Sequence, residues 1–152
     1  MKHISYLILF ACLLTGCKDF LDVELPVNET ITETVFSTDE TATSALMGSY
    51  YSMMDQNRMP YTFSLYCGVS ADELVNYYSI ADLKTLYDNH LLSNNTYVGG
   101  CWSNVYNIIY QANNIYEGCL ASKGMSMPVK RQIMGETLFM RAFWHFNLTN
   151  LF

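Results

Sequence analysis

The sequence predicts an all-α protein. Three stretches place apolar residues at alternating steps of three and four, the period of a helix with one buried face. The clearest spans residues 101–121; the others begin near Ser37 and at Ser126. Hydrophobic residues make up 51% of the chain and charged residues 14%, which is typical of a globular chain with a buried core.

Residues 1–16 predict a secretory signal peptide. A positively charged start precedes an apolar run from Ile4 to Leu14, which is too short to cross a bilayer. The motif Leu14-Thr15-Gly16-Cys17 resembles the lipobox of bacterial lipoproteins. This resemblance implies that cleavage leaves Cys17 as the first residue and that Cys17 carries acyl chains. Because two acyl chains already hold a protein stably on a bilayer, we expect an exported protein anchored to a membrane.

The chain of 152 residues is long enough for one domain with a real core. Its formal net charge is −6, and removal of residues 1–16 takes away Lys2 and leaves −7. An acidic surface argues against nucleic acid as a partner, because binding phosphates needs a basic patch. It also means that lipid, and not a polybasic patch, must hold the protein to the membrane.

Apart from the acylated Cys17, the expected mature chain holds three cysteines, Cys67, Cys101 and Cys119. An odd number excludes a fully paired disulfide framework. If Cys101 and Cys119 lie on one helix, they are ~27 Å apart, which is beyond disulfide reach. Their spacings match no zinc motif. We therefore expect buried free thiols, and no metal or cofactor.

Residues 17–37 predict an extended, lipidated tether. Acidic residues interrupt any helical period there, and Pro26 disfavours helix at the residue before it. Lys18-Asp19 is similar to the signal that sends lipoproteins of some Gram-negative bacteria to the outer face of the outer membrane. The match is partial, because Phe20 stands where a second acidic residue would strengthen it. A plain solvated linker is the alternative.

The first predicted helix starts near Ser37 and is ended by Asn57 and Pro60. Ser37, with Glu40 three residues later, forms a capping-box pattern. Gly48 lies in the interior of this helix and costs ~1 kcal/mol relative to alanine. We therefore expect a neighbouring element to approach closely at Gly48.

Residues 60–100 are the least regular part of the chain. We expect two shorter helices here, around Ala71–Tyr77 and Ile80–Leu92, followed by loops through Gly100. Tyrosines and amides are frequent in this region. Aromatic rings stack on the apolar faces of sugars and amides bridge neighbouring hydroxyls, so this composition suits a sugar-binding surface.

The candidate ligand residues are Tyr77, Tyr78, Tyr97 and Trp102. For each tyrosine the alternative is a half-buried core position with its hydroxyl at the surface. Trp102 has the same alternative, because the helical stripe on which it lies favours the core.

The last two helices lie next to each other in the sequence. Only Glu117 is charged within residues 101–121, so we expect that helix to be covered on more than one side. Gly124 suits a left-handed C-cap. In the helix over residues 126–152, Glu136 and Arg141 are five residues apart and do not share a face, so each needs a partner elsewhere.

Four sequence features resemble the N-terminal region of the SusD/RagB family of outer-membrane nutrient-binding lipoproteins. They are Cys17–Asp22; Phe36–Thr38 leading to Ala45–Tyr50; Trp102–Tyr106 with Ile109 and Ala112-Asn113; and Gly135–Ala142 running into Phe146 and Leu151-Phe152. Two positions depart from the family pattern. Thr137 stands where alanine is typical, and Met140 where leucine is usual.

The resemblance implies a fold of tetratricopeptide-like helix pairs. Residues 38–152 would be the N-terminal part of a larger SusD-like helical domain, truncated at its C-terminus, with much of the ligand surface in the portion that follows. The implied function is non-catalytic. A cell-surface lipoprotein at the outer membrane binds a polysaccharide, an oligosaccharide or another large nutrient and delivers it to a SusC-like TonB-dependent transporter.

Two other functions compete with this one. The first is a lipid-anchored helical-repeat scaffold that binds only proteins, and binding of soluble polysaccharide would separate it from the nutrient binder. The second is an enzyme. A hydrolase needs paired carboxylates at a cleft, but Asp72-Glu73 more simply marks a solvated helix start, and no nucleophile-elbow, zinc-protease or phosphate-loop motif occurs.

Overall fold

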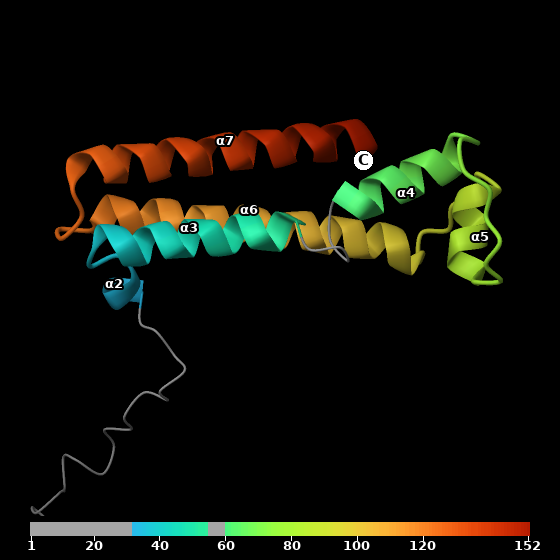
Figure 1. Cartoon of the computed structure of the whole chain (residues 1–152). Coiled ribbons are helices and arrows are strands. Elements are labelled where there is room, and N and C mark those ends of the chain that lie inside the picture. Colours follow the sequence, from blue (N-terminus) through green and yellow to red (C-terminus); the bar gives the residue numbers. More distant parts are fainter. Residues whose placement is uncertain (1–31, 55–59) are drawn as a thin grey trace, which may run out of the picture. The chain divides into compact units, whose positions relative to one another are not determined.

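The computed structural model describes residues 32–54 and 60–152, which belong to one compact unit, Ile31–Phe152. The predicted signal peptide, the lipidation site Cys17 and the tether up to residue 31 lie outside the described residues. Within the described residues every regular element is a helix (Figure 1), which confirms the predicted all-α class. None of these helices combines the length and the apolar character needed to cross a membrane.

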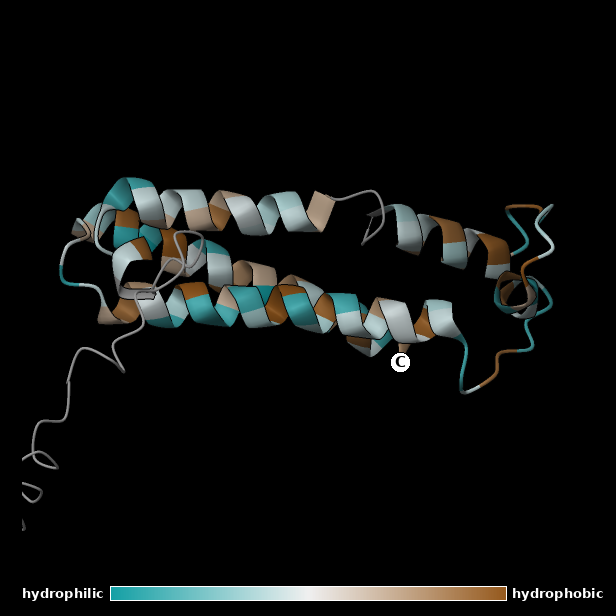
Figure 2. Cartoon of the chain, turned by 90° about the horizontal axis from the view of Figure 1, so that it is seen from below, coloured by the Kyte–Doolittle hydropathy of each residue, from teal (hydrophilic) through white to brown (hydrophobic). Residues whose placement is uncertain are grey.

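Three long helices form the main bundle: α3 (Asp39–Met54), α6 (Thr96–Ala121) and α7 (Met127–Leu151). The pair α6 and α7 is antiparallel, and α3 packs against both (Figure 1). Hydrophobic and hydrophilic residues are interleaved along each long helix (Figure 2). Those that face inward make one core whose most buried members include Leu46, Val105, Ile108, Ile133 and Met140.

The start of α7 and its two unusual residues fit this core. Ser126 is the N-cap, and a proline lies in the first turn, as the sequence predicted. Thr137 is fully buried, and its hydroxyl donates a hydrogen bond of 2.9 Å to the carbonyl of Met134. Met140 is also buried. Both departures from the family pattern are therefore accommodated, because the one added polar atom is satisfied within its own helix.

The end of the predicted tether is not extended. Thr32–Val35 forms a short helix, α2, and Phe36 is buried in the main core. A Cβ atom at Gly118 would lie 2.2 Å from the Phe36 ring, and one at Gly124 would lie 2.0 Å from the carbonyl oxygen of Ser37. The prediction of a tether through residue 37 is wrong at this end, because burial of the Phe36 ring holds the chain against α6.

Three local predictions about glycines and caps are corrected. Gly124 is not a left-handed C-cap, since no glycine in the described ranges has a positive φ; it provides space for the backbone at Ser37. No neighbouring element approaches closely at Gly48, because no atom lies within 4 Å of a Cβ placed there. Thr38, and not Ser37, caps α3: its Oγ1 accepts a hydrogen bond of 3.3 Å from the N–H of Thr41.

A smaller core lies at the end of the bundle where α6 begins. It is built by α4 (Pro60–Ser70) and α5 (Ala81–Tyr87), and its buried members are Val69, Leu83 and Leu86. The sequence instead predicted helices at Ala71–Tyr77 and Ile80–Leu92. The first does not form, because the N–H groups of Glu73 and Leu74 both donate to the carbonyl of Gly68 and end α4 there. The second is limited to the seven residues of α5.

Helix α6 begins at Thr96, five residues before the predicted start. Asn95 is its N-cap, and the side-chain oxygen accepts hydrogen bonds from the N–H groups of Tyr97 and Val98 at 3.0 and 3.1 Å. The amide nitrogen of Asn95 donates to the Asp82 carbonyl and to Thr85 Oγ1, both at 2.8 Å. This buried amide is thus fully hydrogen-bonded, and it ties α5 to α6.

Candidate functional site

The four predicted ligand residues fall into separate places. Tyr77 and Tyr78 lie on the connection between α4 and α5 and are 89% and 71% exposed. Tyr97 is half-buried in the first turn of α6, and Trp102, 44% exposed, lies farther along that helix. The aromatic contacts of the described residues join none of the four to one another. Tyr77 and Tyr78 thus share one exposed connection, whereas neither Tyr97 nor Trp102 is in ring contact with them or with the other.

The connection that carries Tyr77 and Tyr78 is locally ordered. The N–H of Tyr78 donates a hydrogen bond of 2.9 Å to the side-chain oxygen of Asn76, which is an Asx turn. Leu74 packs on Gly68, where a Cβ would come within 2.9 Å of its side chain. Two exposed rings are consequently presented on a turn that is anchored to α4.

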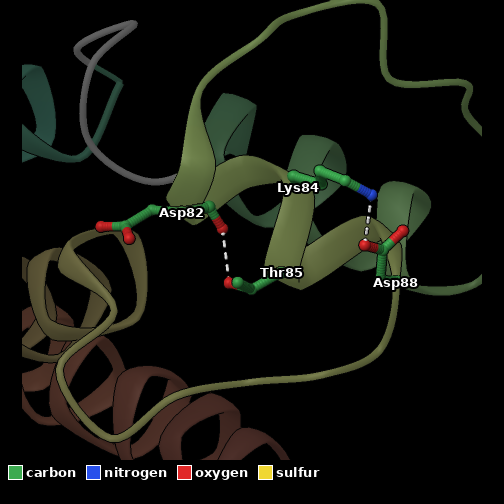
Figure 3. Close-up of polar contacts among 4 residues, drawn as sticks. All are labelled: Asp82, Lys84, Thr85 and Asp88. Atoms are coloured by element: carbon green, nitrogen blue, oxygen red, sulfur yellow. Dashed lines mark hydrogen bonds and ion pairs between the residues drawn. The ribbon is translucent and has the colours of Figure 1, made fainter.

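Helix α5 fixes the other end of that connection. Figure 3 shows the Thr85 hydroxyl donating to the Asp82 carbonyl at 2.8 Å, and Lys84 paired with Asp88. The Asp82 carboxylate accepts hydrogen bonds from the hydroxyl and the N–H of Thr96, and these two bonds lower its pKa. The Lys84–Asp88 pair is exposed and adds little, so packing on α4 and the hydrogen bonds to α6 hold α5 in place.

Tyr97 lies in a core-like environment. Its ring meets that of Tyr66 edge-on, with centroids 5.1 Å apart and an interplanar angle of 63°. Both side chains pack against the smaller core. Burial is the main cause that raises the pKa of Tyr66 to about 12. Tyr97 is thus half-buried, which matches the alternative of a half-buried core position that the sequence left open.

Trp102 belongs to a group of neighbouring aromatic side chains, here named the aromatic platform: Trp102, Tyr106, His145 and Phe152. Trp102 contacts Tyr106 with ring centroids 4.7 Å apart and Phe152 with centroids 5.1 Å apart. Tyr106 in turn meets His145 edge-on at 6.4 Å. All four side chains are partly exposed to solvent. The rings meet at interplanar angles of 46°, 80° and 82°, so the platform offers several separate aromatic faces and edges to solvent.

The sequence interpretation missed three members of the platform. It gave no ligand role to Tyr106, His145 or Phe152. The four-residue spacing of Trp102 and Tyr106 was the one available signal, because such residues share a helix face. His145 and Phe152 reach the platform only through the antiparallel pairing of α6 with α7.

A cavity of about 190 Å³ adjoins the platform. Its lining residues are Phe63, Tyr66, Cys67, Ser70, Leu86, Leu91, Val98, Cys101, Leu151 and Phe152. Phe152 belongs to both the cavity and the platform. The lining is mostly apolar, so the platform continues into a recess that favours flat or apolar groups over charged ones.

The chemistry available at these surfaces is that of binding. Aromatic faces accept the apolar faces of sugar rings, and the phenol hydroxyls can donate or accept hydrogen bonds. Among residues 32–54 and 60–152, no group of three His, Cys, Asp or Glu side chains lies close enough to hold a metal ion.

Comparison with known protein families matches residues 19–152 to a SusD-like family model whose description is "Starch-binding associating with outer membrane". The match covers most of the chain and includes every helix described above. No curated protein and no solved structure shows significant similarity to the chain.

Proposed function

Because this chain belongs to the SusD-like family, described as starch-binding and associating with the outer membrane, we propose that it is a surface lipoprotein that binds a glycan or another large nutrient. It delivers this ligand, chemically unchanged, to a SusC-like TonB-dependent transporter. The observation that carries the proposal is the family match over residues 19–152. The all-α fold and its exposed aromatic groups agree with it.

The proposed ligand contacts are the aromatic platform and the exposed pair Tyr77 and Tyr78. Trp102 and Tyr106 are the two inner platform residues, because the ring of each contacts two other members. Tyr97 supports the adjoining cavity, because its ring packs edge-on against Tyr66, which lines that cavity. Stacking of pyranose rings on these faces needs no charged group, which suits a neutral glycan.

The proposed anchor is the acyl-modified Cys17, which follows the predicted signal peptide over residues 1–16. Acyl chains are needed for this role, because the acidic chain offers no polybasic patch for lipid headgroups. The protein then resides in the outer membrane and faces the cell exterior, where it meets glycans that are too large to diffuse across that membrane.

The proposed transporter partner is supported by exposed apolar side chains on α7. Phe139 and Phe146 are each 69% exposed, and Phe143 is 44% exposed. Apolar side chains that are exposed together often mark a surface that binds another protein. A lipid-anchored scaffold that binds proteins alone would use the same residues, so transport and glycan binding need separate tests.

The test of delivery is affinity purification of the full gene product from detergent-solubilised outer membranes. We expect a TonB-dependent barrel to be recovered with the wild-type chain and to be lost with Cys17→Ala, which removes the anchor. Fractionation of the same cells is the control that the wild-type protein reaches the outer membrane. A correctly localised protein that recovers other proteins and no barrel would replace the delivery role with the scaffold role.

A further inference from the structure

The three cysteines of the described residues occupy different environments. Cys101, on α6, is 8% exposed, and Cys119, on the same helix, is completely buried in the main core. Cys67, on α4, is exposed. All three are free thiols. The expectation of buried free thiols is thus confirmed for Cys101 and Cys119 and wrong for Cys67, because its position on α4 leaves it exposed.

Cys67 and Cys101 lie on the walls of the same cavity. The helices that carry them are in contact at this point, because Tyr66, next to Cys67, packs on Tyr97, one turn before Cys101. Cys119 is outside this group. It lies 18 residues farther along the same helix, which is ~27 Å at 1.5 Å per residue.

We propose that Cys67 and Cys101 are an oxidisable pair that closes into a disulfide between α4 and α6 when a disulfide oxidant is supplied. In the first step the Cys67 thiolate attacks one sulfur of the oxidant, forming a mixed disulfide and releasing one thiol. In the second step the Cys101 thiol loses its proton to water, and the resulting thiolate attacks the Cys67 sulfur and releases the second thiol. Two electrons and two protons pass to the oxidant, which leaves as two thiols.

The environments of the two thiols set this order. Burial, followed by the proximity of Cys67, raises the pKa of Cys101 to about 11, so the thiolate of Cys101 is scarce at neutral pH and the second step is the slow one, which quickens as the pH rises. Cys67 is the thiol that solvent reaches. The exposed sulfur therefore meets the oxidant, and the buried one resolves the mixed disulfide.

The cross-link would hold the smaller core against α6. It would close a loop of the chain that contains α5 and the connection bearing Tyr77 and Tyr78. Cross-linking stabilises a fold chiefly by restricting the unfolded chain. This inference rests on the cavity and on the packing of α4 and α6, and it is independent of the proposed function.

The experiment treats the purified full chain with oxidised glutathione under native conditions, blocks the remaining thiols with iodoacetamide and maps the peptides by mass spectrometry. Peptide mapping assigns each of the five cysteines separately. We expect a linked Cys67–Cys101 peptide, with Cys119 left free. We also expect the oxidised chain to melt roughly 5–10 °C above the reduced one, and dithiothreitol to reverse the shift.

Two matched variants define the outcome. In Cys119→Ser the Cys67–Cys101 link should form as in the wild type, whereas in Cys101→Ser the reaction should stop at a glutathione adduct on Cys67. The proposal is overturned if wild-type Cys67 also stops at the adduct while Cys101 remains open to alkylation after denaturation. It is equally overturned if neither thiol reacts, or if Cys119 takes either place in the link.

Discussion

The Tyr50 hydroxyl, on α3, donates a hydrogen bond of 2.9 Å to Oε2 of Glu136, on α7. The other carboxylate oxygen of Glu136 accepts a hydrogen bond of 2.9 Å from Gln132. Both oxygens are therefore satisfied, and the contact confirms that Glu136 has a partner outside its own helix. Burial, the hydrogen bond and the nearby carboxylate charge, in that order, raise the pKa of Tyr50.

Removing this hydroxyl should destabilise the bundle. We expect Tyr50→Phe to lower the free energy of unfolding by about 1 kcal/mol, because Glu136 loses a partly buried donor. Urea unfolding followed by circular dichroism measures the change. Tyr51→Phe is the control, since Tyr51 is 78% exposed and should change stability little. Equal effects of the two substitutions would show that the interhelical bond contributes nothing.

Two glycines in helix interiors should respond in opposite directions to alanine. Gly118→Ala places a methyl group 2.2 Å from the Phe36 ring and should cost about 1–3 kcal/mol. Gly48→Ala meets no atom within 4 Å and should stabilise the protein by up to about 1 kcal/mol through helix propensity. Thermal melts of both variants test the pair. A stabilised Gly118→Ala variant would mean that Phe36 does not pack on α6.

The cap at the start of α6 should depend on Asn95. Asn95→Ala removes two acceptor and two donor contacts and should cost about 1–2 kcal/mol. Amide hydrogen exchange should accelerate at Tyr97 and Val98, whose N–H groups lose their acceptor. Asn94→Ala is the matched control, because Asn94 is exposed. Unchanged exchange in Asn95→Ala would contradict the assigned cap.

Alkaline pH should weaken the smaller core. The folded pKa of Tyr66 is about 12, above the ordinary value of 10.0, so folding favours the neutral phenol. Its contribution is complete below pH 10.0 and is lost as pH rises toward 12. Tyr66→Phe should remove this part of the pH dependence. Parallel unfolding curves of wild type and variant at about pH 9 and about pH 11 measure it.

If the free energy of unfolding of the wild type falls no faster with rising pH than that of Tyr66→Phe, the fold does not hold the Tyr66 hydroxyl neutral. The comparison must be made between the two proteins, because burial also raises the pKa of Cys101 and that thiol titrates in the same range.

The sequence predicted well where one apolar face repeats along a long helix. The start of α7 after Ser126 and the need of Glu136 for an outside partner followed from spacing and charge, and the family resemblance implied the helix pairs that α6 and α7 exemplify. Helix α4 was not predicted, because the apolar residues within 60–70 show no helical period. The start of α6 was placed too late, because Asn95 and the following glycines are also typical of loops.

The candidate surfaces were only partly predictable. Exposed Tyr77 and Tyr78 could be proposed from residue type and position, yet their presentation depends on the packing of Leu74 against Gly68. The platform joins residues of α6 to His145 of α7 and to Phe152, which follows α7. The spacing of apolar residues within one helix does not show which residues of another helix will lie against it. Tertiary packing supplies that information, which the spacing of residues lacks.

The most direct test of the account is affinity electrophoresis of the full gene product in gels that contain soluble starch or another neutral polysaccharide. We predict that the gel retards the wild-type chain. We also predict that the variant with both Trp102→Ala and Tyr106→Ala binds at least about tenfold more weakly. Tyr51→Ala, exposed on α3, should bind as the wild type does. Free migration of the folded wild-type chain in every polysaccharide gel would contradict the glycan-binding function.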